Sequence, residues 1–133
     1  MNYRLFFLIS ILTLSLWTNG IHASDSSSSS THAQIVVGSK NFLENRLLAE
    51  MFAQLIEART DISVTRRLGL AGTQVTFEAL KTGAIDIYPE YTGTGLVSIL
   101  RQPPTKSART TLNQVRSEFL TRWNLVWISP RPN

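Results

Sequence analysis

The sequence predicts an α/β fold in which a parallel-rich sheet is flanked by helices. Three observations lead to this prediction: a β-branched stretch closed by glycine at 34–38, a long stretch with apolar residues at three-to-four spacing, and an alternating stretch at 62–68. Strand, helix and strand in this order form a βαβ unit, whose strands pair in parallel through a right-handed crossover. The 133 residues leave room for one ordinary domain and exclude a two-lobed enzyme.

The first 23 residues have the order of a secretory signal peptide. Arg4 supplies a positive charge, residues 5–17 carry no charge, and Ala23 is a small residue suited to cleavage. An uncharged stretch of this length, at about 1.5 Å per residue, is too short to cross a membrane. We therefore expect residues 1–23 to be a cleaved signal peptide, residues 24–33 a Ser-rich linker and residues 34–133 the folded part of an exported, periplasmic protein.

The first helix is expected to begin at Asn41, with Asn41 as its cap and Glu44 three residues later, and to run for about 18 residues. Its apolar side chains form a broad stripe that should face the core: Leu47, Leu48, Met51, Phe52, Leu55 and Ile56. The alternation of strand and helix then repeats along the chain. The remaining expected elements are a helix at 73–82, a strand at 84–88, a short helix at 96–100, a helix at 108–122 and a strand at 125–128.

Composition narrows the classes of function. The chain has no cysteine, so it can hold no disulfide, thiol nucleophile, thiolate zinc site or lipid-bearing cysteine. Both histidines, His22 and His32, precede the first predicted strand, which argues against a histidine-based enzyme or a metal site, and no cofactor is expected. The net charge of +4 is concentrated in residues 101–133, where six basic residues stand singly without interleaved aromatics. Nucleic-acid binding is therefore not expected.

Three loops follow the predicted strands, at 38–41, 69–73 and 89–95, and ligands of parallel sheets gather at the carboxyl ends of strands. The glycines at 69 and 72 lack the spacing of a nucleotide-binding motif and also fit a plain tight turn from strand to helix. The third loop offers aromatic faces and hydroxyls to a ligand with cationic and anionic ends. Tyr91 should be exposed there and Tyr88 packed. Asp86 and Glu90 could form a hydrolase pair, but Glu90 more plausibly fixes the loop by accepting backbone N–H groups.

Four blocks together resemble a known family. They are VGSKNF at 37–42, LAEM at 48–51, LGLAGT at 68–73 and EALKTGAIDIYPEYTGT at 78–94. The chain is similar, collinearly from residue 34 to about residue 128, to the substrate-binding proteins of osmoprotectant ABC importers. These are the glycine betaine, carnitine and choline receptors of the quaternary amine uptake family, which deliver their ligands to an ABC transporter permease in the membrane.

The resemblance implies the first lobe of a type II periplasmic-binding-protein fold, and a function as the extracytoplasmic solute-binding component of an importer for quaternary ammonium ligands. Tyr91 and Thr94 would contact the ligand, and Lys40, with its neighbours Ser39 and Asn41, would lie at the same cleft. Aromatic faces would hold the trimethylammonium group, while Lys40 and Thr94 would take the carboxylate of a betaine.

Members of this family continue with a second lobe and a returning segment that completes the first. The resemblance therefore implies an incomplete fold, shortened to the N-terminal lobe. Two other interpretations stay open: a remnant of such a receptor that transports nothing, and the effector-sensing domain of a transcription regulator. The predicted signal peptide argues against the regulator, and the lack of cysteine and of histidine in the folded part argues against an enzyme.

Overall fold

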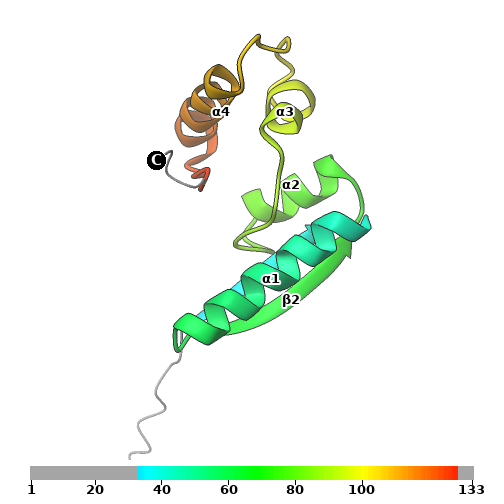
Figure 1. The fold of residues 1–133 in the computed structure, drawn as a ribbon, viewed down its shortest axis with the longest axis vertical. Helices are drawn as coiled ribbons and strands as arrows, with labels where there is room; N and C mark the ends of the chain where they lie inside the picture. Colours follow the sequence, from blue (N-terminus) through cyan, green and yellow to red (C-terminus); the bar gives the residue numbers. More distant parts are fainter. Residues whose placement is uncertain (1–32, 129–133) are drawn as a thin grey trace, which may run out of the picture. The chain divides into compact units, whose positions relative to one another are not determined.

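The computed structural model describes residues 33–128 (Figure 1). The expected signal peptide at 1–23 and nearly all of the linker at 24–33 lie outside this range. The described elements follow in the order β1 (Gln34–Lys40), α1 (Leu43–Arg59), β2 (Ser63–Leu70), α2 (Thr73–Lys81), α3 (Thr92–Thr94), the π-helix η1 (Gly95–Ile99) and α4 (Ala108–Trp123).

The predicted βαβ unit is confirmed. β1 and β2 pair in parallel, with Gln34 opposite Ser63 and Gly38 opposite Arg67, and α1 packs on both strands (Figure 1). The register shifts between Gly38 and Lys40, where β1 passes into the loop before α1. The β-branched residues of β1 place Val37, which is fully buried, under the helix. The sheet thereby fixes the position of the loop that follows β1.

The face that α1 turns to the sheet differs from the expected one. Its buried residues are Asn45, Ala49 and Ala53, whereas Met51 is 56% exposed and Phe52 is 37% exposed. Small side chains let the helix approach the strands closely, so the short residues occupy the contact and the long apolar ones lie beside it. The expectation that Met51 and Phe52 belong to the core is therefore wrong.

Asn41 does not cap α1. The residue at the cap position is Phe42, whose backbone is extended and whose side chain makes no capping hydrogen bond. Asn45, in the first turn of the helix, instead bonds to the backbone at Lys40 and Pro89.

The expected strand at 84–88 is present only as one bridge, between Ile87 and Val37. The backbone N–H groups of Ala84 and Ile85 bond back to the Ala79 carbonyl at the end of α2, and so do not join a ladder. Three backbone hydrogen bonds still tie the stretch to β1: Gly38 N donates to Ile87 O at 2.8 Å, and Val36 O accepts from Asp86 N at 2.8 Å and from Ile87 N at 3.4 Å. The stretch therefore runs beside β1 without completing a third strand.

A second apolar cluster joins the helices that follow. Its buried members come from α2, η1 and α4: Phe77, Leu96, Leu100, Val115 and Phe119. The short helix expected at 96–100 begins earlier, at Thr92 in α3, and continues as η1. The strand expected at 125–128 is irregular, because Leu125 N bonds to Phe119 O at the end of α4. Val126 and Ile128 are 74% and 80% exposed.

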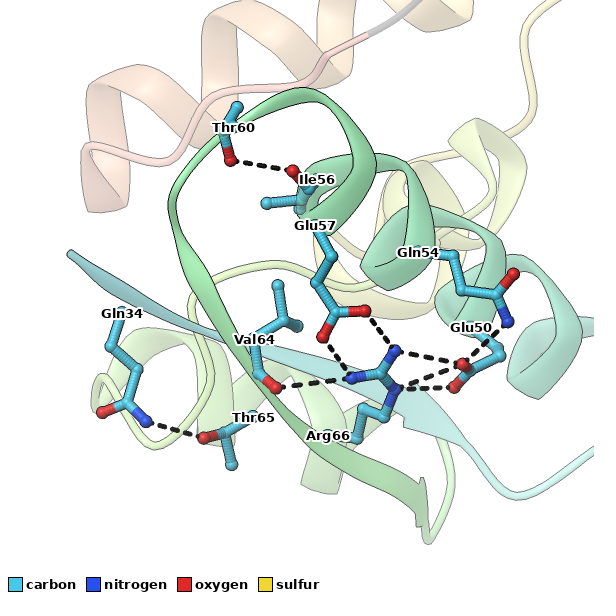
Figure 2. Close-up of polar contacts among 9 residues, drawn as sticks. All are labelled: Gln34, Glu50, Gln54, Ile56, Glu57, Thr60, Val64, Thr65 and Arg66. Atoms are coloured by element: carbon cyan, nitrogen blue, oxygen red, sulfur yellow. Dashed lines mark hydrogen bonds and ion pairs between the residues drawn. The ribbon is translucent and has the colours of Figure 1, made fainter. Parts of the chain in front are cut away.

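A charged network on the surface joins α1 to β2 (Figure 2). The guanidinium of Arg66 lies between two carboxylates of α1, 2.9 Å from Glu50 and 2.7 Å from Glu57. Arg66 lowers the pKa of both glutamates, chiefly by hydrogen bonding. Within residues 33–128, no helix is long and apolar enough to cross a membrane.

Candidate functional site

A buried ion pair lies where β1 ends and the 88–91 stretch passes it. Lys40 Nζ is 2.6 Å from Glu90 Oε1, and each side chain is only 5% exposed. Two charges removed from water in this way are stable only when they are paired and their remaining hydrogen-bonding capacity is used. The geometry therefore predicts that Glu90 has further partners.

Glu90 does have further partners. Its Oε1 atom accepts a hydrogen bond from the backbone N–H of Tyr91 at 2.8 Å, and its Oε2 atom accepts one from the Tyr88 hydroxyl at 3.2 Å. Burial, followed by the charge and hydrogen bond of Glu90, raises the pKa of Tyr88 far above its usual range. The prediction that Glu90 fixes its loop by accepting a backbone N–H group is confirmed. Asp86 accepts from Val36 N at 2.7 Å, so each carboxylate has a structural partner.

Asn45 joins the same two segments from inside α1. The side chain is fully buried; its Oδ1 accepts from Lys40 N at 2.7 Å and its Nδ2 donates to Pro89 O at 2.8 Å. Ser39, also fully buried, donates to Lys40 O at 3.0 Å and accepts from Gly69 N at 2.8 Å. These bonds lock together the end of β1, the end of β2 and the stretch before α3.

An aromatic pair lies above the ion pair. The rings of Phe42 and Tyr91 have centroids 6.3 Å apart and planes 25° from parallel, and they are 41% and 36% exposed. Lys40 Nζ lies 5.5 Å from the Phe42 centroid and 5.2 Å from the Tyr91 centroid. Desolvation, and then a hydrogen bond with Glu44, raises the pKa of Tyr91. Both rings therefore present apolar, electron-rich faces to solvent.

The structure thus brings together most of the residues that the sequence singled out. Tyr91 is exposed, as expected, and Thr94 is half-buried one helical turn later in α3. Ser39 and Lys40 are buried in the network, and Asn41 is exposed in the same loop. Sequence reasoning did not select Phe42 or Asn45. Phe42 ends the block at 37–42, and Asn45 lies near the start of the predicted first helix. A single phenylalanine or asparagine, however, does not indicate from sequence alone which residues it will contact in the fold.

A cavity of about 610 Å³ lies apart from the aromatic pair, between α1, the 87–90 stretch and the C-terminal stretch at 125–128. Its walls are mostly apolar, and they include the side of α1 that carries Leu48, Phe52 and Leu55. The cavity explains why these residues of α1 are not packed. Neither Lys40 nor Tyr91 lines it.

Residues 33–132 match a family model described as the substrate binding domain of ABC-type glycine betaine transport systems. The chain belongs to this family. Its members are extracytoplasmic substrate-binding proteins of ABC transporters and not enzymes, and they work with transporter permeases. The resemblance drawn from the four sequence blocks is therefore confirmed.

Two curated relatives align over most of the chain. One is the Helicobacter pylori ergothioneine transport permease/ergothioneine binding protein EgtU, 29% identical over 123 residues, or 92% of this chain and 21% of that protein. The other is the glycine betaine-binding protein YehZ of Escherichia coli, 30% identical over 100 residues, or 74% of this chain and 32% of that protein. The chain thus spans about a fifth to a third of the length of these relatives.

Solved structures confirm the fold class. Apo YehZ from Escherichia coli superposes with a TM-score of 0.66 at 28% identity, covering 77% of this chain and 36% of that one. A glycine betaine/carnitine/choline ABC transporter structure superposes with a TM-score of 0.62 at 21% identity, covering 70% of this chain and 35% of that one. The chain therefore has the α/β fold of periplasmic binding proteins, over one part of their length.

Proposed function

We propose that this chain is the ligand-binding N-terminal lobe of a periplasmic receptor for quaternary ammonium compounds of the glycine betaine and choline type. The receptor would deliver its ligand to an ABC transporter permease. The observation that carries the proposal is the exposed face of Tyr91, which a buried network holds at the carboxyl end of β1. Ligands of parallel sheets bind at this edge.

The chemistry of the ligand fits this surface. A trimethylammonium group has no N–H to donate, so it is held by aromatic faces, each contributing roughly 0.5 to 2 kcal/mol according to how far the contact is desolvated. Tyr91 supplies such a face, and Thr94, three residues later at the end of α3, would supply a hydroxyl. Ser39 and Lys40 end β1, and Asn41 follows them.

The relatives support the choice of ligand class. YehZ is named for glycine betaine and EgtU for ergothioneine, so the ligands to compare are glycine betaine, ergothioneine and choline. The matched part is 21% of EgtU and 32% of YehZ, and a single lobe would leave one side of the ligand in water. Affinity is therefore expected to be weak for the chain alone, because closing lobes are what desolvate the bound group.

The test is calorimetry on two proteins: the chain itself, and a chimera in which residues 33–128 replace the matching segment of YehZ. The chimera should bind at least one of the three ligands, and Tyr91→Ala should weaken binding about 2-fold to 30-fold. Phe52→Ala is the matched control, since Phe52 is an aromatic side chain of similar exposure outside the site.

If both alanine variants of the chimera bind like its unaltered form, Tyr91 is not a contact. A chimera that unfolds cooperatively but binds none of the three ligands contradicts the receptor function and favours a remnant that transports nothing. Periplasmic location is tested by fractionating cells that carry the full chain with a C-terminal tag.

A further inference from the structure

We infer that Trp127 is a positioning residue of the candidate site, because its indole ring lies against Gly95 and holds the turn from Tyr91 to Gly95 in the conformation that binds ligand. Trp127 acts only through this turn and contacts no ligand itself. The effect on ligand affinity rests on the proposed function, whereas the effect on the conformation of the turn does not. The C-terminal stretch at 125–128, which is irregular in the structure, thereby takes part in binding.

The turn that carries Tyr91 and Thr94 ends at Gly95, where α3 passes into the π-helix η1. Gly95 N donates to Tyr91 O at 2.8 Å, and Gly95 O accepts from Leu100 N at 3.0 Å. Gly95 thus joins both helical segments through its own backbone. A π-helix is rare and occurs mostly as a single turn, frequently at functional sites. The conformation of the turn therefore depends on what packs against Gly95.

The indole ring of Trp127 packs directly on the backbone of Gly95. A Cβ atom added to Gly95 would lie 2.6 Å from Cζ2 of Trp127 and 3.0 Å from Cη2, closer than carbon atoms pack. The backbone angles of Gly95 are φ −55° and ψ −44°, which any residue adopts in a helix. Glycine is therefore needed at this position because of the Trp127 ring and not because of the backbone angles.

Contacts with α4 hold Trp127 in this position. Its ring is edge-on to Phe119, with centroids 5.2 Å apart and planes at 81°, and its carbonyl accepts a hydrogen bond from Arg116 Nε at 3.4 Å. Asn124 ends α4 in a left-handed conformation, with φ 56°, which redirects the chain after the helix. Trp127 therefore links α4 to the turn at Gly95.

A second tryptophan of the same apolar cluster provides the comparison. The ring of Trp123, in α4, packs on Phe77 and Phe119 at centroid distances of 4.8 and 5.1 Å. Trp123 is half-buried, as Trp127 is, but it is not among the nearest neighbours of a Cβ atom on Gly95. Loss of either ring disturbs the cluster, whereas loss of Trp127 also removes the contact with the turn.

The test is a double-mutant cycle on the full chain. Trp127→Phe keeps an aromatic side chain but removes the two ring atoms that lie at Gly95, and Gly95→Ala adds a methyl group at the same place. Each single variant should disturb the turn. Gly95→Ala/Trp127→Phe should restore it, because the methyl group fills the space that the shorter ring leaves. Trp123→Phe is the matched control.

The first measurement needs no ligand. Amide hydrogen exchange, followed by NMR, compares Gly95 N–H, which bonds within the turn, with Gly38 N–H, which bonds to Ile87 O beside the sheet. The ratio of the two rates separates local opening of the turn from global unfolding. This ratio should rise about 10-fold in Trp127→Phe and in Gly95→Ala, and return to within about 3-fold of wild type in the double variant.

Trp123→Phe should leave the exchange ratio unchanged. The inference is overturned if Trp127→Phe and Trp123→Phe have the same ratio, or if the double variant opens at the turn as readily as the single variants do. Because Gly95→Ala forces a close contact, it is the variant most at risk of not folding. In that case the comparison of Trp127→Phe with Trp123→Phe decides alone.

The second measurement is the affinity for choline, glycine betaine and ergothioneine in NMR titrations. Apparent affinity falls in proportion to the fraction of molecules that hold the binding conformation, so Trp127→Phe should weaken binding about 3-fold to 10-fold and Trp123→Phe should not. If the exchange ratios follow the cycle but none of the three ligands binds the wild-type chain, the proposed function fails and the positioning of the turn stands. If a ligand binds and both phenylalanine variants bind it as wild type does, the function stands and the inference fails.

Discussion

Replacing Asn45 by alanine tests the network that holds the candidate site. The side chain is fully buried and bonds two backbone groups, Lys40 N and Pro89 O, at 2.7 and 2.8 Å. Without it both groups lose their partner inside the protein, at a cost of about 1 to 3 kcal/mol each. We therefore expect Asn45→Ala to lower the free energy of unfolding by about 2 to 6 kcal/mol, a large part of the stability of a small domain.

The assay is urea unfolding followed by circular dichroism, with the midpoint and slope compared between variants. Asn41→Ala is the matched control: Asn41 is exposed in the same loop and caps no helix, so its loss should change stability by less than about 0.5 kcal/mol. Asn45→Asp keeps the acceptor and loses the donor, so its stability should lie below wild type. If Asn45→Ala unfolds at the same urea concentration as Asn41→Ala, the loops are not held by this side chain.

Three further changes test other parts of the fold. Gly38→Ala puts a methyl carbon 2.6 Å from the Cδ1 atom of Ile85, so its urea midpoint should fall, with partial recovery in Gly38→Ala/Ile85→Val. Arg66 lowers the pKa of the two α1 glutamates that it contacts. Their stabilisation is present above the ordinary carboxylate pKa of 4.5 and is lost as pH falls below it. The wild-type midpoint should therefore drop more between neutral pH and about pH 3 than that of Arg66→Gln, and equal drops would refute this account. Met51→Ala, at a 56% exposed position, should cost less than about 0.5 kcal/mol, whereas a loss of several kcal/mol would show that this face is packed.

Much of the fold could be predicted from the sequence, because its signals are local. The spacing of apolar residues, and the glycines that end strands and helices, located β1, α1, β2, α2 and α4 to within about two residues of their observed ends. The stretches at 84–88 and 125–128 have the composition of strands, but strand pairing depends on a neighbour. In the described structure the first stretch divides its backbone hydrogen bonds between the end of α2 and β1, and Leu125 N in the second bonds to the end of α4. Composition reports the propensity of a stretch and not the partner it finds.

The packing of α1 shows a second limit. The sequence displays a wide apolar stripe, and periodicity favours burying it. The closest approach to the strands is made instead by Ala49 and Ala53, which are small. Which face of a helix packs depends on the shape of the surface opposite, and that information lies in another segment of the chain.

Some features of the candidate site could be predicted from nearby residues in the sequence, and others could not. The exposure of Tyr91 and the loop-fixing role of Glu90 follow from a proline and a strand end close by in sequence. The pairing of Lys40 with Glu90, 50 residues away, and the contact of Phe42 with Tyr91 join distant segments, which local patterns do not reveal.

The separation of these partners also has a consequence for folding kinetics. The contacts from Lys40 to Glu90 and from Asn45 to Pro89 close loops of 50 and 44 residues. Long closures lose more chain entropy than the turns of α1, so they form late. In stopped-flow refolding we expect helical circular dichroism to recover before the environment of Tyr91 does. Ligand added during refolding should therefore leave the early phase unchanged and trap only molecules that have completed it.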